Sequence, residues 1–401
     1  MTTKATELPD GIVQNNALQS ILDGSATTVP IDTTIEAPLG ETVPTVTATL
    51  VVDSKCSLAE GILYDHQRHA LLYTDILGKA FYKINLGTGK GTRFDLSKQL
   101  CSFAMLQDRD GYLCAWNDGF ELYDLEKAAR LMPDPPTVLE GSATPPYPTV
   151  ELPSAVGVRL NDGRVDRTGK HFVCGAFYGN NPGVTIKVYS VQAASDKSAA
   201  TTATKASCSG DGLVYHEIMD NVRVTNGLCF SKDGNSMYFA DSPTQEIYRF
   251  DYQDGGVNHE TKDLIFSTAK PNESDAPKAE EDGGKERDTE GTPYKTDISV
   301  PDGSIVDSDG MIWNAVWREG DYPAPGYIRR IDPNTGKVVF RVNVPDATSQ
   351  VSCCCFGGKD LDVLFITTAG EWIDRTKQPN AGGIYAIKLP FKGMKENRFV
   401  L

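Results

Sequence analysis

The chain alternates short apolar, β-rich runs with turn residues and shows no long stretch of helical periodicity. Runs such as 112–116 (YLCAW) and 237–240 (MYFA) are bounded by Gly, Asn, Asp or Ser. Short apolar runs between turn residues are typical of β-strands. The pattern therefore predicts an all-β fold.

One pattern recurs along the chain: an apolar residue, a turn resembling D-x-x-G, an aromatic-rich strand, a short loop, and a strand that ends in a polar residue. Six copies can be recognised, at residues 63–85, 106–125, 165–191, 230–251, 306–332 and 356–389, the second and sixth being the loosest. The turns begin at Asp65, Asp108, Asp166, Ser231, Asp307 and Gly357, so the intervals are 43, 58, 65, 76 and 50 residues. A four-stranded propeller blade needs about 40–50 residues. The repeat predicts a six-bladed β-propeller with a central channel.

The repeat also sets the predicted domain organisation. Residues 46–401 form a single propeller, and the strand at 46–52 (VTATLVV) pairs with the last blade, which closes the ring and removes a sheet edge. Residues 1–45 are an N-terminal extension to which no role is assigned.

Two long segments interrupt the repeat. An insertion at about 267–297 contains the acidic segment 271–291, with eight acids and three bases, and residues 134–153 are rich in proline. We interpret the acidic segment as a solvated surface loop, with a lid or partner-binding loop as the alternative.

The composition excludes several classes of partner and indicates where the protein is located. The 39 basic and 54 acidic residues give a net charge of −15, which argues against nucleic acid or an anionic membrane surface as a partner. No apolar run is long enough to span a membrane, and the N-terminus lacks the apolar region of a signal peptide. The nine cysteines form no C-x-x-C pair, and Cys353–Cys355 alternate across a strand. The sequence therefore predicts a cytoplasmic protein with reduced, buried thiols.

Polar residues recur at one position of the repeat. The residues five positions before each turn are Glu60, Phe103, Asn161, Asn226, Asp302 and Ser352. Four of them carry a carboxylate or amide oxygen, and burying such groups without a partner costs a few kcal/mol each. Glu60, Asn226 and Asp302 would therefore meet at one end of the channel, where oxygen ligands suit a hard divalent cation. The alternative is that Asn226-Gly227 and Asp302-Gly303 are ordinary turn signals.

Arg159 adds a positive charge to this set. It lies two residues before Asn161, so the two side chains share one face of a strand. Arg159 either forms an ion pair with the acids or binds an anionic or hydroxyl-rich substrate. The chain contains no G-x-S-x-G, H-E-x-x-H or P-loop motif, its five histidines do not cluster, and L-G-T-G-K-G at 86–91 fits a turn better than a dinucleotide loop.

Several segments resemble the senescence-marker-protein/gluconolactonase family, which includes regucalcin. They are EGILYDHQRHALLYTDILGKAFYKINLGTG, RLNDGRVDRTGKHFVCG, NGLCFSKDGNSMYFADS, PDGSIVDSDGMIWNAVW, CCFGGKDLDVLFITTA and NAGGIYAIKLPFKGMKENRF. The resemblance implies a six-bladed propeller with one divalent metal held by Glu60, Asn226 and Asp302. It also implies that Arg159 and Asn161 contact the substrate and that Asp302 is the general base. Where some members carry an acidic loop that touches the sugar, this chain has AFYGNNPG, which leaves Tyr178, Asn180 or Asn181 for that role.

The sequence therefore predicts a metal-dependent lactonase that hydrolyses a sugar-acid lactone. The cation is expected to be calcium, with zinc, magnesium and manganese as alternatives, and the partner is a small-molecule lactone, with the oligomeric state left open. Two other functions stay open: an organophosphate or ester hydrolase with the same site, and a non-catalytic calcium-binding regulatory propeller.

Overall fold

The computed structural model describes residues 4–26, 32–36, 41–131, 152–194, 207–208, 212–268, 299–318, 325–345 and 348–401. The acidic segment 271–291 and residues 134–150 lie outside the described residues. In the part that is described, no helix is long and apolar enough to cross a membrane.

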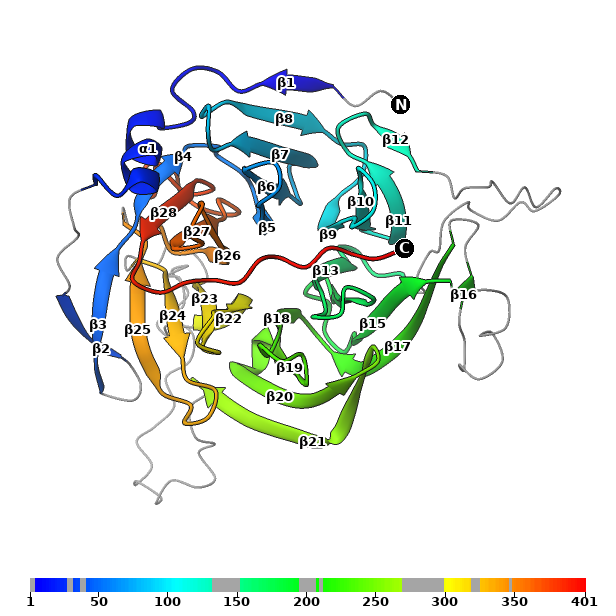
Figure 1. The fold of residues 1–401 in the computed structure, drawn as a ribbon. Helices are drawn as coiled ribbons and strands as arrows, with labels where there is room; N and C mark the ends of the chain where they lie inside the picture. The colour runs from blue at the N-terminus through cyan, green and yellow to red at the C-terminus, as the bar shows by residue number, and fades with distance from the viewer. Residues whose placement is uncertain are drawn as a thin grey trace, which may run out of the picture.

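Six antiparallel sheets surround a central channel, which confirms the predicted six-bladed propeller (Figure 1). The strands of each blade are given from the innermost outward. Blade 1 consists of β5 (Ala59–Asp65), β6 (Ala70–Asp75), β7 (Ala80–Asn85) and β8 (Gly91–Asp95), and blade 2 of β9 (Leu100–Met105), β10 (Tyr112–Trp116), β11 (Gly119–Asp124) and β12 (Ala129–Arg130). Blade 3 consists of β13 (Arg159–Val165), β14 (Phe172–Phe177), β15 (Ile186–Ala193), β17 (Leu213–Val222) and β16 (Ser207–Cys208). Blade 4 consists of β18 (Thr225–Phe230), β19 (Ser236–Asp241), β20 (Glu246–Gln253) and β21 (Gly256–Ser267), and blade 5 of β22 (Ser299–Val306), β23 (Ile312–Arg318), β24 (Tyr327–Ile331) and β25 (Val338–Asn343). Blade 6 contains β26 (Val351–Gly357), β27 (Val363–Thr368) and β28 (Ile384–Lys388). A short 3-10 turn, Ser242–Thr244, follows β19.

The ring closes through the N-terminal part of the chain. Strand β4 (Thr49–Val52) pairs antiparallel with β28, as predicted for residues 46–52. The predicted strand is divided, however, because residues 46 and 47 belong to β3 (Glu41–Thr47), which pairs parallel with β25 of blade 5. The last blade is therefore built from both ends of the chain.

Residues before the propeller add to its outer surface. Strand β1 (Ala5–Glu7) pairs with β8 of blade 1, and β2 (Asp32–Glu36) pairs with β3 beside blade 5. Helix α1 (Asn15–Asp23) buries Leu18 and Ile21 against Val51 and Val52. These additions cover sheet edges that would otherwise expose unpaired backbone groups.

The hydrophobic core lies between neighbouring blades. Between blades 1 and 2, for example, the ring of Phe81 contacts those of Phe103 and Tyr112 edge-to-face, with centroids 5.3 and 5.4 Å apart. Eight cysteines are free and buried in the described part of the chain, as the thiol pattern predicted.

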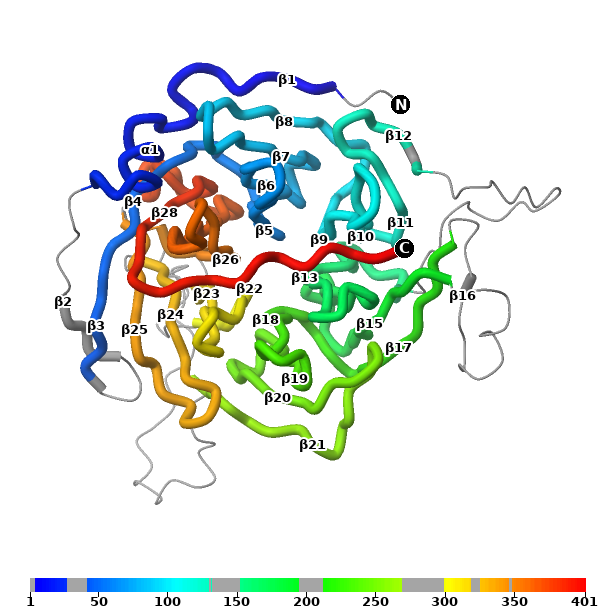
Figure 2. The backbone as a smooth tube through the Cα atoms, viewed as in Figure 1, coloured from blue at the N-terminus to red at the C-terminus, as the bar shows by residue number. Residues whose placement is uncertain are grey.

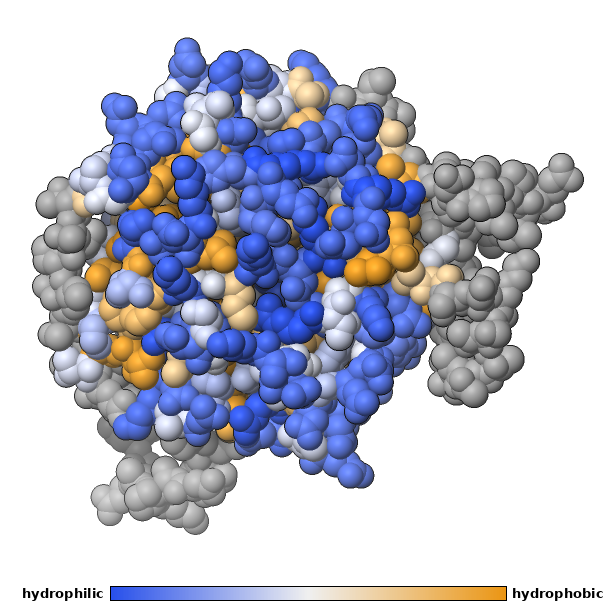
Figure 3. All heavy atoms as spheres, viewed as in Figure 1, coloured by the Kyte–Doolittle hydropathy of each residue, from blue (hydrophilic) through white to orange (hydrophobic). Residues whose placement is uncertain are grey.

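The C-terminal strap, residues 391–400, crosses one end of the channel without joining a sheet (Figures 1 and 2). Its backbone bonds reach blades 5, 6, 2 and 3: Ser308 N to Lys392 O, Gly393 N to Leu361 O, Phe399 N to Met105 O, and Val400 N to Gly169 O, each 2.8 Å. The face that carries the strap is largely hydrophilic, with scattered apolar patches (Figure 3).

Candidate functional site

The predicted site residues lie on the innermost strands, each beside an irregularity in strand pairing. Pairing shifts between Glu60 and Leu63 in β5, between Asn226 and Cys229 in β18, and between Pro301 and Ser304 in β22. Such bulges twist a strand and redirect its side chains. Gly61 and Gly227 have φ values of +57° and +65°, which favour glycine. The Asn-Gly and Asp-Gly pairs are thus parts of bulged strands and not turns between strands.

Hydrogen bonds connect the site across blades 3, 4 and 5. Asn161 Nδ2 donates to Asn226 Oδ1 at 3.1 Å and to Thr225 O at 2.9 Å. Asn226 Nδ2 donates to Ser242 Oγ at 2.8 Å, and Ser242 Oγ donates to Pro301 O, the residue before Asp302, at 2.7 Å. These bonds fix the amide of Asn226, so that its Oδ1 and not its Nδ2 is directed toward Asn161.

Glu60 and Asp302 are close enough to influence each other's ionisation. Burial, followed by the charges of Glu60 and Asp162, raises the pKa of Asp302 well above its usual range. Burial and the charge of Asp162 likewise raise the pKa of Glu60, while Arg159 lowers the pKa of both carboxyls. The site therefore contains an excess of acid that one guanidinium does not offset.

Asp162 is a functional candidate that the sequence analysis did not select. Its Oδ2 accepts the backbone N–H of Leu228 at 3.0 Å, which ties β13 to the bulge behind Asn226. Burial raises its pKa, with Arg164 as the main opposing charge. The sequence feature that could have selected Asp162 is an acid directly after Asn161; in the structure it lies inside the bulge between Leu160 and Gly163.

Arg159 and Asn161 lie together, as their spacing predicted. Arg159 Nη1 donates to Asn161 Oδ1 and, at 2.9 Å, to Leu160 O. The guanidinium also lies over the Phe177 ring, 4.8 Å from its centroid. Both residues are more than nine-tenths buried, so Arg159 is held in one orientation beside the acids.

Two members of the predicted ring do not contribute to the site. Phe103 is buried in the core between blades 1 and 2, because an aromatic side chain gains more from that apolar interface than from a polar channel. Ser352 Oγ donates to Ala59 O at 2.6 Å and therefore joins blade 6 to blade 1.

The loop between β14 and β15 of blade 3, which contains Tyr178, Asn180 and Asn181, is held mainly by its own polar groups. Asn181 Nδ2 donates to three carbonyl oxygens, those of Val156, Tyr178 and Gly179, at 2.8 to 3.1 Å. Asn180 has a positive φ of 58°. The Asn181 amide therefore holds the loop together, which leaves it few donors for a substrate.

The residues present fit a hard cation by their chemistry. In the described part of the chain, no three His, Cys, Asp or Glu side chains form a metal site by themselves. The predicted ligand set is not of that kind, because it combines the carboxylates of Glu60 and Asp302 with the amide oxygen of Asn226. A divalent cation would favour the ionised form of two carboxyls that burial and mutual repulsion disfavour.

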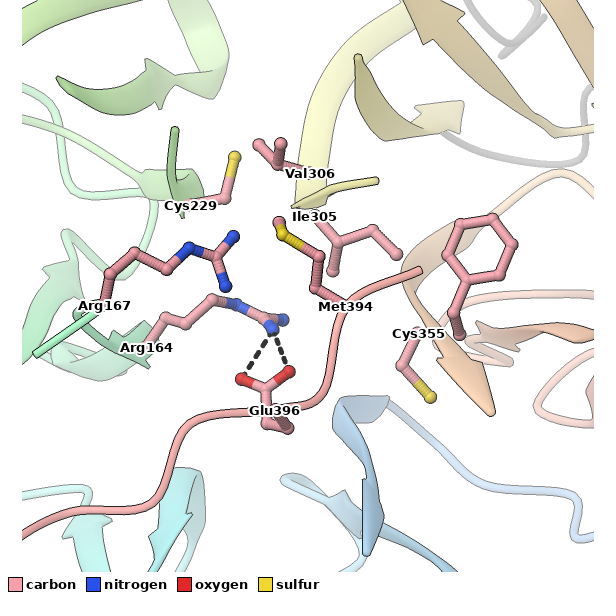
Figure 4. A pocket seen from close by; sticks show the side chains of 9 residues that line it. Arg164, Arg167, Cys229, Ile305, Val306, Cys355, Met394 and Glu396 are labelled. Atoms are coloured by element: carbon pink, nitrogen blue, oxygen red, sulfur yellow. Dashed lines mark hydrogen bonds and ion pairs between the residues drawn. The ribbon is translucent and has the colours of Figure 1, made fainter. Parts of the chain in front are cut away.

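A second group of polar residues lies at the strap end of the channel. Arg164 and Arg167 of blade 3 point toward Glu396 and Met394 of the strap, around a small cavity that Cys229 also lines (Figure 4). Arg164 Nη1 donates to both Glu396 carboxylate oxygens at 2.9 Å. Arg398 of the strap binds Asp65, the last residue of β5, so the strap lies where the innermost strands end. The predicted site residues lie in the first half of their strands and therefore nearer the opposite end of the channel: Glu60, Asn161, Asn226 and Asp302.

Comparison with known proteins identifies the family. The sequence profile of the SMP-30/gluconolactonase/LRE-like region matches residues 58–370. The chain belongs to this family. It is 27% identical over 357 residues to the putative sugar lactone lactonase YvrE of Bacillus subtilis, covering 86% of this chain and 96% of that protein. It is 26% identical over 367 residues to the L-arabinolactonase of Azospirillum brasilense, covering 88% and 95%.

Solved structures of other proteins share the fold. The calcium-binding protein regucalcin from Agrobacterium tumefaciens superposes with a TM-score of 0.64 at 22% identity, over 89% of this chain and 98% of that chain. A gluconolactonase from Xanthomonas campestris superposes with a TM-score of 0.52 at 16% identity, over 90% and 97%. At these identities the likeness establishes the propeller and not the substrate.

Proposed function

We propose that this protein is a hydrolase of cyclic esters that opens a sugar-acid lactone with the help of one divalent cation. Glu60, Asn226 and Asp302 would hold the cation, with calcium as the first candidate and zinc, magnesium and manganese as the others. The observation that carries the proposal is the meeting of buried acids with a fixed amide and a fixed guanidinium at one end of the channel. Relatives named as lactonases support the choice of reaction.

The bound cation would supply a positive charge that polarises the lactone carbonyl and stabilises the oxyanion that develops on it. Asp302 would accept a proton from the attacking water. The water oxygen then bonds to the carbonyl carbon, the ring C–O bond breaks, and the ring oxygen takes the proton back from Asp302 and leaves as a hydroxyl group.

Arg159 and Asn161 would bind the lactone and orient its ester. Their mutual hydrogen bond and near-complete burial mean that little conformational freedom is lost on binding. Leu160 O and the Phe177 ring hold the guanidinium from the sides that face the protein. The remaining donors of the guanidinium are those suited to a hydroxyl-rich ligand.

The proposal is tested by following acid release from a panel of aldonolactones with a pH indicator, with and without a chelator. We expect turnover with calcium, its loss on chelation, and its return when calcium is added back. Glu60→Gln serves as the matched variant, since it keeps the side-chain shape and removes one ligand charge. Calcium-loaded protein with no activity on any lactone would refute the proposed reaction, and activity on paraoxon alone would favour an organophosphate hydrolase.

A further inference from the structure

The rim loop, residues 369–378, follows β27 and lies at the same end of the channel as Glu60. Ala369 forms an antiparallel bridge with Leu58, two residues before Glu60. Gly370 N donates to Ser57 O at 3.0 Å. Because β5 runs from this point into the channel, the rim loop stands just outside the entrance to the candidate site.

Side chains hold the rim loop in a fixed position. Arg375 Nη2 donates to Cys56 O at 3.3 Å, and Gln378 Oε1 accepts the N–H of Ser349 at 3.0 Å. Yet Trp372, in the middle of this fixed loop, is 76% exposed and has a φ of +55°. A bulky residue in the left-handed region is rare and strained, and such strain is concentrated at functional sites. An exposed tryptophan gains no burial that would offset this strain.

Glu371, the neighbour of Trp372, is half-buried near the start of the rim loop, within range of the charge of Arg159. Glu371 belongs to blade 6 and Arg159 to blade 3, which stand opposite each other in the sixfold ring. Burial raises the pKa of Glu371, and the only charge that opposes this is Arg159. Among the described residues, no hydrogen bond or ion pair joins these two side chains, and Arg159 directs Nη1 to Asn161 and Leu160. The Glu371 carboxylate is therefore an acceptor that no other described residue occupies, within range of the guanidinium that we assign to the substrate.

We propose that Glu371 and Trp372 form an outer substrate subsite that selects for hydroxyl groups. Glu371 accepts hydrogen bonds from hydroxyls of the ligand on the side opposite Arg159, and Trp372 packs its ring against the carbon face of the ligand. This proposal rests on the proposed lactonase function and adds two residues that would select for the hydroxyl groups of its substrate. A lactone without hydroxyls would gain nothing from Glu371.

The test compares glucono-δ-lactone with δ-valerolactone, which has the same ring size and no hydroxyl groups. Glu371→Ala should lower kcat/KM for glucono-δ-lactone about 10- to 100-fold, the scale of a hydrogen bond to a charged group. The same variant should change kcat/KM for δ-valerolactone less than about twofold. Trp372→Ala should lower kcat/KM for glucono-δ-lactone about fivefold. Lys377→Ala, on the same loop, is the control and should leave both substrates unchanged.

Two results would overturn the subsite. Equal losses on both lactones in Glu371→Ala would show a structural role for the loop, and equal activity of variant and wild type would show no role. Calorimetric titration of the calcium-loaded protein with sorbitol tests binding without hydrolysis. Weaker sorbitol binding in Glu371→Ala than in wild type supports the subsite even if the wild type hydrolyses neither lactone, a result that would refute the proposed function alone. Equal sorbitol binding by the two proteins, or none by either, would count against the subsite itself.

Discussion

We expect the ion pair between Arg164 and Glu396 to be one of the main interactions that hold the C-terminal strap against the propeller. Arg164 Nη1 donates to both carboxylate oxygens at 2.9 Å, and the side chains are only 9% and 17% exposed. The neighbouring Arg167 donates to the backbone carbonyls of Phe230 and Ser231 and not to an acid. Glu396→Gln keeps the shape of the side chain but leaves the buried guanidinium of Arg164, and the half-buried one of Arg167, without its charge.

Removing one partner of a buried ion pair costs about 3–5 kcal/mol. We expect the lower end, about 3 kcal/mol, because Glu396 keeps some contact with water. An unfolding entropy of about 2.1 cal/mol/K per residue gives about 0.8 kcal/mol/K for the whole chain, so the Tm should fall by about 4 °C. Scanning calorimetry of the calcium-loaded protein measures this shift. Glu217→Gln is the matched control, since its pair with Lys187 at 2.6 Å is exposed, and it should lower stability by less than about 1 kcal/mol.

A double variant separates charge from packing. Arg164→Met with Glu396→Leu removes both charges and should recover most of the stability that Glu396→Gln loses, because no unpaired charge is then buried. A Tm for Glu396→Gln that matches the control variant would refute the view that this pair is shielded from water. A double variant less stable than the single one would show that shape, and not charge, holds the strap.

Three further predictions concern the candidate metal site. Glu60→Gln should retain far less calcium than wild type after dialysis, since it removes one of two ligand charges; wild-type occupancy would exclude Glu60 as a ligand. Asp302→Asn should keep more calcium than Glu60→Gln but turn over roughly 10²–10⁴ times more slowly, and near-normal turnover would place the base elsewhere. Burial raises the pKa of Glu60 and Asp302 in the folded protein. Between about pH 5 and 8 these carboxyls are therefore ionised in the unfolded chain more fully than in the folded one, and the metal-free protein should lose stability as the pH rises through this range. Calcium should therefore raise the Tm more at pH 8 than at pH 5; an equal rise at both would argue against these ligands.

The propeller was predictable because its blades repeat, while features outside the repeat were not. The turn at Asp166 and its equivalents mark the end of each innermost strand, so their intervals count the blades. Strand β1 and helix α1 were not predicted, since each occurs once and is stabilised by contacts distant in sequence. Glu371 was missed for the same reason, because it lies in a loop that no other blade repeats.

A count of one position per strand selects residues that hydrogen-bond to one another, such as Asn161 and Asn226, but it passes over a neighbour where a bulge changes the strand. Counting five residues back from each turn selects Asn161 but passes over Asp162. In a regular strand these neighbours would face opposite sides. The bulge between Leu160 and Gly163 turns both toward the neighbouring blade, where Asn161 reaches Thr225 O and Asp162 reaches Leu228 N. The same offset selects Phe103, whose apolar ring has its lowest free energy in the core.

Strand β13 explains how the two ends of the channel depend on each other. Arg159, Asp162 and Arg164 lie on it in order, so opposite charges alternate from the candidate site toward the strap. Arg164 is the main charge that opposes the raised pKa of Asp162, and Asp162 in turn raises the pKa of Glu60 and Asp302. The charges of Glu396 and Asp162 both act on the guanidinium of Arg164, and Glu396 also bonds to it directly. The strap and the candidate site are therefore linked through Arg164, a charge that acts on Glu396 of the strap and on Asp162 beside the candidate site.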